Sequence, residues 1–150
     1  MYKEGAMAVE DTLQEVELFS EMTRKDLSRL VKVIVTREYK KGDVIVREGD
    51  LGIAFYVVSK GHIEIVRALG KPEEHVIFTH SPGGFFGEMA LFDNQLRNAS
   101  ARAKDDCQCL VLTKWDFNAE VNAPGSRVAV AMLPILARRI RTLNEAAETH

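Results

Sequence analysis

The chain has 150 residues, of which 46% are apolar and 28% charged, an ordinary composition for one globular domain with a substantial core. Its 20 basic and 22 acidic residues give a net charge of -2, and no basic stripe of the kind found in nucleic-acid-binding proteins stands out. The N-terminus lacks the apolar stretch of a signal peptide, and the longest apolar run, residues 128–137, is too short to span a bilayer. We therefore expect a cytoplasmic protein with neither a nucleic-acid nor a membrane partner.

The first part of the chain is expected to be helical. Residues 1–10 carry no periodic pattern and are interpreted as a loose start, and residues 11–19 as a short helix. Thr23 followed by Asp26 resembles a capping box, which opens a helix. The helix that begins there has an apolar stripe with helical spacing, made of Leu27, Leu30, Val31 and Ile34.

From Val35 onward the apolar pattern changes from a helical period to alternation. Short runs rich in β-branched and aromatic residues follow one another, separated by turn signals such as those at residues 48–50, 60–61 and 70–72. This spacing predicts an antiparallel sandwich or barrel. The expected strands are residues 36–39, 43–47, 54–59, 62–67, 74–80, 98–103 and 108–113.

Of the two cysteines, Cys109 lies on the last of these expected strands and Cys107 directly precedes it. Cys107 and Cys109 are separated by one residue, so on a strand they point to the same face. A metal site would need further ligands, and the histidines at positions 62, 75, 80 and 150 show no ligand spacing. We therefore predict buried, apolar roles for both thiols and no metal site.

Two helices are expected after the strands. Residues 114–117 begin a short helix that ends near residues 122–125. Ser126 then caps a longer one, in which Pro134 removes a backbone hydrogen bond, so a kink or break is expected there. The apolar positions of this segment are Val128, Met132, Leu133, Leu136, Ile140 and Leu143.

The stretch from Gly83 to Ser100 carries the functional prediction. Its Pro-Gly-Gly entry is a strong turn signal, and Gly87 would let a phosphate approach the backbone at the start of a short helix. Arg97 offers a planar fork for two phosphate oxygens, whereas Glu88 can only accept hydrogen bonds, for which a ribose 2′-hydroxyl is a suitable donor. The alternative is that Glu88 and Arg97 form an ordinary surface pair.

At these residues the sequence resembles a known family. Residues 86–91 together with residues 97–100 are similar to the phosphate-binding cassette of cyclic nucleotide-binding domains, such as those of catabolite activator and protein kinase A regulatory proteins. The resemblance extends over about residues 18–144 and implies an antiparallel β jelly-roll barrel with N-terminal helices and C-terminal hinge and lid helices. We accordingly assign residues 1–17 to an N-terminal extension with a short helix and residues 18–150 to the cyclic nucleotide-binding domain.

The resemblance also implies roles for individual residues. The backbone of Gly87, Met89 and Ala90 would hold the cyclic phosphate with Arg97 paired to it, and Glu88 would accept the ribose hydroxyl. The expected ligand site comprises Phe86, Gly87, Glu88, Met89, Ala90, Arg97 and Asn98. Two positions depart from the family pattern: Leu96 stands where proline is frequent, and Asn98 stands where cAMP binders often have a small residue and cGMP binders threonine.

The base would need an apolar wall and a lid. Ile65 and Ile77 lie on strands that could supply the wall, although core packing alone also explains them. The last helix, by resemblance, covers the base, with Pro134 as its hinge and Leu136, Ile140, Leu143 or one of Arg138, Arg139 and Arg141 near the ligand; Arg139 is our choice among the arginines. The alternative is a bent surface helix without a gating role.

These observations predict a sensor and not an enzyme, because no nucleophile–base pair or pair of catalytic carboxylates is visible. The ligand would be a cyclic nucleotide, cAMP ahead of cGMP, with no other cofactor. Neither a DNA-binding nor a kinase module follows the lid helix in this sequence, so the signal would pass to an unknown protein effector, and the last helix is a candidate for pairing two copies.

Two other functions remain as alternatives. A degenerate domain could retain the fold as a protein-interaction module with an empty pocket. A cupin-like metal enzyme on a similar jelly roll is the more remote alternative, because it would require clustered histidine ligands.

Overall fold

The computed structural model describes residues 2–148, which divide by their contacts into two compact units. A helical unit comprises the described residues up to Lys32 and from Ala119 onward, and a β unit comprises Val33–Asn118. The predicted boundary between residues 17 and 18 falls inside the helical unit. In sequence, the β unit is thus inserted between the first and the last helices.

The helices form mostly where the sequence predicts them. The backbone N–H of Asp26 donates to Thr23 Oγ1 over 3.2 Å, so Thr23 caps the second helix as expected, and Leu27 and Leu30 on its apolar stripe are fully buried. The helices are α1 (Tyr2–Glu15), the 3-10 helix η1 (Glu17–Phe19), α2 (Arg24–Val33), α3 (Lys114–Val121), which joins the two units, and α4 (Val128–Glu148).

The start of the chain differs from the prediction. α1 begins at Tyr2, whereas the sequence pattern favoured a loose start over residues 1–10, of which residue 1 lies outside the described residues. Residues 2–10 are rich in Ala, Glu, Met and Lys, and the intrinsic propensity of these residues accounts for a helix that apolar periodicity did not reveal. The expected helix over residues 11–19 is also divided, because α1 ends at Glu15 and η1 follows.

The last helix is not broken at its proline. Val128 N–H donates to Ser126 Oγ over 3.3 Å, which confirms the expected cap, but α4 then runs without interruption through Pro134. Pro134 and Val130 are both exposed, so the Val130 carbonyl that loses its helical partner can be hydrated. At an exposed position such a carbonyl need not stay without a hydrogen-bond partner, so the proline does not have to end the helix.

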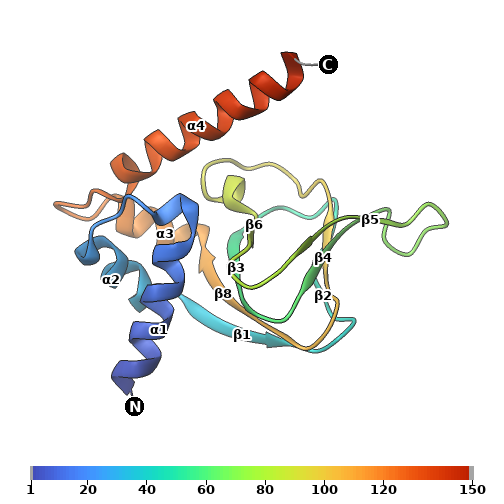
Figure 1. Cartoon of the computed structure of the whole chain (residues 1–150), viewed down its shortest axis with the longest axis horizontal. Coiled ribbons are helices and arrows are strands. Elements are labelled where there is room, and N and C mark those ends of the chain that lie inside the picture. Colours follow the sequence, from blue (N-terminus) through green and yellow to red (C-terminus); the bar gives the residue numbers. More distant parts are fainter. Residues whose placement is uncertain (1, 149–150) are drawn as a thin grey trace. The chain divides into compact units, whose positions relative to one another are not determined.

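The β unit confirms the mainly β fold with flanking helices, and all of its strand pairs are antiparallel (Figure 1). In the described part of the chain, the strands form two four-stranded sheets, in the orders β1-β8-β3-β6 and β2-β7-β4-β5, that are not closed into one barrel. The strands are β1 (Val35–Tyr39), β2 (Val44–Val46), β3 (Ala54–Lys60), β4 (Ile63–Arg67), β5 (His75–His80), β6 (Phe85–Phe86), β7 (Ser100–Ala103) and β8 (Cys107–Thr113).

The two sheets share one apolar core. It receives inward-facing residues from both sheets, including Tyr56 of β3, Ile63 of β4 and Ala101 of β7. Cys107 and Cys109 are buried in it as free thiols, as the sequence predicted, and burial raises the pKa of Cys109 to about 12. The thiols therefore act as small apolar side chains.

Candidate functional site

The predicted cassette forms a tight turn between β6 and the long loop that leads to β7. Gly87 adopts the left-handed conformation with φ 81° and ψ 16°, and the 3-10 helix η2 (Glu88–Leu91) follows. The Ala90 N–H donates to the Gly87 carbonyl over 3.1 Å. Of the three backbone groups that the family resemblance implies as phosphate donors, the Ala90 amide is thus engaged within the turn.

The side chain of Arg97 packs against uncharged groups of Gly52, Ala54, Tyr56 and Gly87, which we call the Arg97 seat. Its Nη2 donates to the Ala54 carbonyl over 2.7 Å, and its Cζ lies 5.9 Å from the centre of the Tyr56 ring, within the range of a cation–π contact. A Cβ on Gly87 would collide with Nη1, and one on Gly52 would lie 3.3 Å from Nε. The two glycines therefore leave the space that the guanidinium occupies.

The charge of Arg97 is influenced by Glu88 but takes part in none of the ion pairs found among the described residues. Burial lowers the pKa of Arg97, while Tyr56 and Glu88 act in the opposite direction, and an arginine pKa starts so high that the side chain stays charged. No carboxylate in the described part of the chain forms an ion pair with it. A half-buried cation in this state is suited to an anionic ligand.

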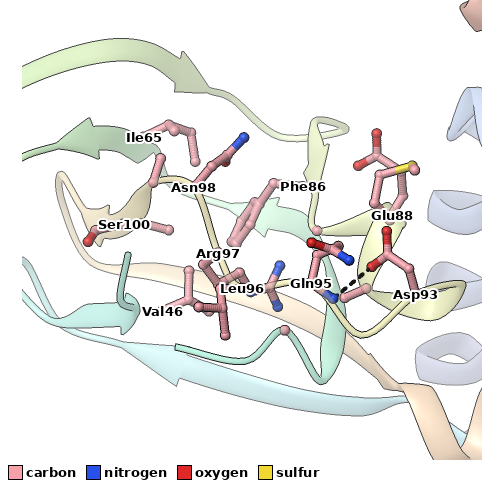
Figure 2. Close-up of a pocket in the computed structure, with 16 residues that line it drawn as sticks. Val46, Ile65, Phe86, Glu88, Asp93, Gln95, Leu96, Arg97, Asn98 and Ser100 are labelled. Carbon is pink, nitrogen blue, oxygen red and sulfur yellow. Dashed lines mark hydrogen bonds between the residues drawn. The ribbon is translucent and has the colours of Figure 1, made fainter. Parts of the chain in front are cut away.

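A pocket of about 290 Å³ opens beside Arg97. Figure 2 shows Ile65 and Asn98 at one end of it, Phe86 and Arg97 in the middle, and Glu88 and Asp93 toward the other end. All lining residues belong to the β unit: Val46, Gly52, Ile65, Phe86, Gly87, Glu88, Met89, Ala90, Asp93, Gln95, Leu96, Arg97, Asn98, Ala99, Ser100 and Ala101.

The structure thus brings together most of the predicted site residues. All seven positions of the predicted cassette site, Phe86, Gly87, Glu88, Met89, Ala90, Arg97 and Asn98, line the pocket, as does Ile65. Sequence reasoning missed Val46 and Gly52, which come from an earlier segment. Backbone hydrogen bonds tie that segment to the cassette loop, from Gly49 N to Arg97 O over 2.8 Å and from Arg97 N to Asp50 O over 2.7 Å. A local sequence pattern cannot predict hydrogen bonds between two segments so far apart in the chain.

Two predicted base-pocket residues are not among the lining residues. Arg139 belongs to the helical unit. Ile77 lies on β5, but the pairing register shifts between Ile65, which faces Phe78, and Val66, which faces Val76. Ile77 is therefore the extra residue of a β-bulge, and simple alternation of side chains between the two faces does not hold there.

A row of rings runs from the Arg97 seat to the edge strand β5. Tyr56 stacks on Phe86 with centroids 4.9 Å apart and planes at 6°, and Phe86 stacks on His80 at 5.8 Å and 25°. His80 in turn meets Phe78 edge-on at 4.7 Å. Burial lowers the pKa of His80, an effect that Glu88 partly opposes.

The tip of the cassette loop is fastened to the start of α3. Lys114 Nζ donates to the Asp93 carbonyl and to Asn94 Oδ1, and the rings of Phe92 and Phe117 meet edge to face at 5.5 Å. These contacts lie within the β unit. They join the loop that shapes the pocket to the helix that leads out of this unit.

Neither a cluster of metal-ligating side chains nor a membrane-spanning helix is present among residues 2–148. In this part of the chain, no group of three or more His, Cys, Asp or Glu side chains is arranged to hold a metal ion. Likewise, none of the described helices combines the length and the apolar character needed to cross a membrane.

Comparison with known proteins agrees with this geometry. Residues 36–123 match the cyclic nucleotide-binding domain family, which is more than half of the chain, so the chain belongs to that family. The cAMP-dependent protein kinase regulatory subunit of Blastocladiella emersonii is 33% identical over 70% of this chain and 26% of its own length. Human cGMP-dependent protein kinase 2 is 32% identical over 73% of this chain and 15% of its own length. The chain therefore spans about a quarter or less of these relatives.

A solved structure extends the comparison to most of the chain. The N-terminal domain of a transcriptional regulator from Streptomyces coelicolor A3(2) covers 91% of this chain and 95% of its own, with a TM-score of 0.82 and 29% identity. This neighbour places the antiparallel β architecture, with its flanking helices, within the range of known members of the fold.

Proposed function

We propose that the pocket binds a purine 3′,5′-cyclic nucleotide, cAMP ahead of cGMP, and that the domain senses this ligand without catalysing a reaction. The observation that carries the proposal is Arg97, a charged guanidinium oriented by uncharged groups at the pocket and paired with none of the described carboxylates. The relatives include both cAMP- and cGMP-dependent kinase proteins, so family membership supports either base.

The roles of the cassette residues follow from their chemistry. Arg97 would pair with the cyclic phosphate, together with the backbone at Gly87 and Met89, where the left-handed glycine keeps the approach open. The Ala90 amide would contribute only by sharing its hydrogen atom with the Gly87 carbonyl. Glu88 lines the same pocket and would accept the ribose 2′-hydroxyl, since an ionised carboxylate accepts hydrogen bonds and repels phosphate.

The route of the signal would start at the cassette tip. Lys114 and the Phe92–Phe117 contact fasten this tip to α3, so a ligand that favours one position of η2 would bias α3 and the helices beyond it. An unidentified protein effector would read the change. The exposed apolar side chains of α4, which include Leu133, Ile140 and Leu143, offer it a surface, and the same residues would serve if α4 pairs two copies of the chain.

The test is a calorimetric titration with cAMP and with cGMP. A hydrogen bond to a charged group contributes about 1.5–3 kcal/mol, so Arg97→Ala should weaken binding about ten- to 150-fold. Arg102→Ala is the matched control, because Arg102 lies outside the pocket lining and pairs with Glu64 and Glu74; it should bind as the wild type does.

Two results would contradict the proposal. Equal affinity of the wild type and Arg97→Ala would remove Arg97 from the site. Absence of heat and of thermal stabilisation with either nucleotide would favour the degenerate interaction module, for which the engaged Ala90 amide is the specific structural argument.

A further inference from the structure

An exposed aromatic ring stands beside the pocket on the edge strand β5. Phe78 faces Ile65 directly in the β4–β5 register, and Ile65 lines the pocket. Directly opposed residues of antiparallel strands have side chains on the same face, with Cβ atoms about 4.5–5.5 Å apart. Phe78 therefore extends the wall that Ile65 begins, beyond the present lining of the pocket.

The bulge at Ile77 is what gives Phe78 this position. Val66 faces Val76 and Ile65 faces Phe78, so Ile77 has no partner of its own on β4. Without this extra residue, strict alternation would pair Ile65 with Ile77 and turn Phe78 to the opposite face. A wall that would otherwise be aliphatic thus becomes aromatic.

The Phe78 ring is fixed by a neighbouring ring and yet largely exposed to solvent. It contacts His80 edge-on at 4.7 Å, and His80 stacks on Phe86, which lines the pocket. Yet 58% of the surface of Phe78 remains exposed. A large apolar ring that is fixed by its neighbours and uncovered on one side is suited to stacking on another flat group.

The direction of the pocket brings a base toward this ring. From Arg97 the chain continues through Asn98 and Ala99 to β7, where Ser100 faces Val66 and Ala101 faces Ile65 on β4. Arg97 lies in the middle of the pocket; one end carries the carboxylates of Glu88 and Asp93, and the other carries the apolar Ile65 of β4, which pairs with β5 (Figure 2). The apolar end is the one suited to a base. A nucleotide whose phosphate lies on Arg97 would extend its base toward this end.

We propose that Phe78 is the base-stacking residue of this site, an inference that rests on the proposed function. Because every nucleobase presents a π face, stacking on Phe78 strengthens binding without choosing between adenine and guanine. The larger face of a purine gains more from the ring than that of a pyrimidine. Phe78 thereby selects the class of base, while hydrogen-bonding groups elsewhere select its identity.

The test compares three variants in the titration with cAMP and cGMP. Loss of a stacking side chain costs about 1–3 kcal/mol per base, which corresponds to about five- to 150-fold weaker binding for Phe78→Ala. Phe78→Tyr retains the ring and should restore the wild-type affinity. Thr79→Ala is the matched control, because Thr79 follows Phe78 on β5, faces Glu64 on β4 and lies outside the pocket lining, and its affinity should equal that of the wild type. Thermal unfolding without ligand should be the same for Phe78→Ala and Phe78→Tyr.

The failure of this inference is distinguishable from that of the proposed function. If the wild type binds neither nucleotide, both are overturned. If the wild type binds but Phe78→Ala binds equally well, or Thr79→Ala weakens binding as much, only the role of Phe78 is overturned. The same holds if Phe78→Tyr fails to restore affinity.

Discussion

The hydrogen bond and the ring contact that orient the guanidinium of Arg97 both come from groups without formal charge, although Glu88 also acts on its charge. The Ala54 carbonyl accepts from Nη2 and the face of Tyr56 lies against Cζ, while Gly52 and Gly87 leave the space free of side chains. A carboxylate in the same place would hold the arginine as firmly but would compete with an anionic ligand. The arrangement therefore fixes the direction of the charge and leaves the charge itself available.

His80 should make the stability of the fold depend on pH. Burial lowers its pKa in the folded state below the unfolded value, which is about 6.5. Between these two values the unfolded state binds more protons, so the free energy of unfolding decreases as the pH falls below about 6.5. In His80→Phe, which retains an aromatic ring against Phe86, this decrease should be smaller. Urea unfolding at about pH 7 and about pH 5 measures it; equal decreases in both proteins would assign the effect to other groups.

Single residues were predictable where the chemistry is local in sequence. Glu88 and Arg97 could be proposed because a glycine-led turn, a short helix and a returning loop fall within one stretch. Gly52 could not, because its contact with Arg97 depends on the pairing of two segments more than forty residues apart. The contact of Tyr56 with Arg97 could not be predicted either, because a strand pattern does not indicate which aromatic ring will lie against which cation.

Among the elements, the strands followed the sequence pattern closely and the departures have local causes. Alternation cannot foresee the bulge that makes Ile77 an extra residue and gives its place beside the pocket to Phe78. Helix α1 depends on intrinsic propensity, and α4 continues past Pro134 at an exposed position, where a freed carbonyl can be hydrated. These features depend on solvent and on neighbouring strands, which a one-dimensional pattern does not contain.

Pro134 removes one backbone hydrogen bond from α4, and we expect α4 to bend at this point when a ligand binds. Replacement by Ala restores one backbone hydrogen bond and should stabilise the isolated helix by up to about 3 kcal/mol. If Pro134 is a hinge, nucleotide-dependent changes in amide hydrogen exchange over residues 128–148 should be present in the wild type and reduced in Pro134→Ala. Changes of the same size in both proteins would leave α4 a surface helix without a gating role.

At the scale of the whole molecule, the pocket belongs to one unit and the last helix to the other. All lining residues lie within Val33–Asn118, so binding can be complete in the β unit alone. The boundary between the two units falls within α3. Sequence periodicity predicted both groups of elements.

Nucleotide should therefore stabilise the β unit first. Ligand at about 100 times its dissociation constant adds about 2.7 kcal/mol to the folded state, which for a chain of this size raises the melting temperature by roughly 5–11 °C. Differential scanning calorimetry with and without cAMP or cGMP measures the shift. If the two units unfold in separate transitions, the melting temperature of the helical unit should not change, because this unit contributes no residue to the pocket lining. No shift in any transition would contradict a nucleotide-binding pocket.

The order of the two units along the chain has a mechanical consequence. Both ends of the described chain belong to the helical unit, in which α4 and α1 each contact η1. Tension applied at the two ends would pass from one to the other through these helix contacts, without stretching the sheets. The strands that form the pocket would thus carry no load until the helices had separated. Tension on the two ends of the chain would therefore leave the pocket undistorted up to that point.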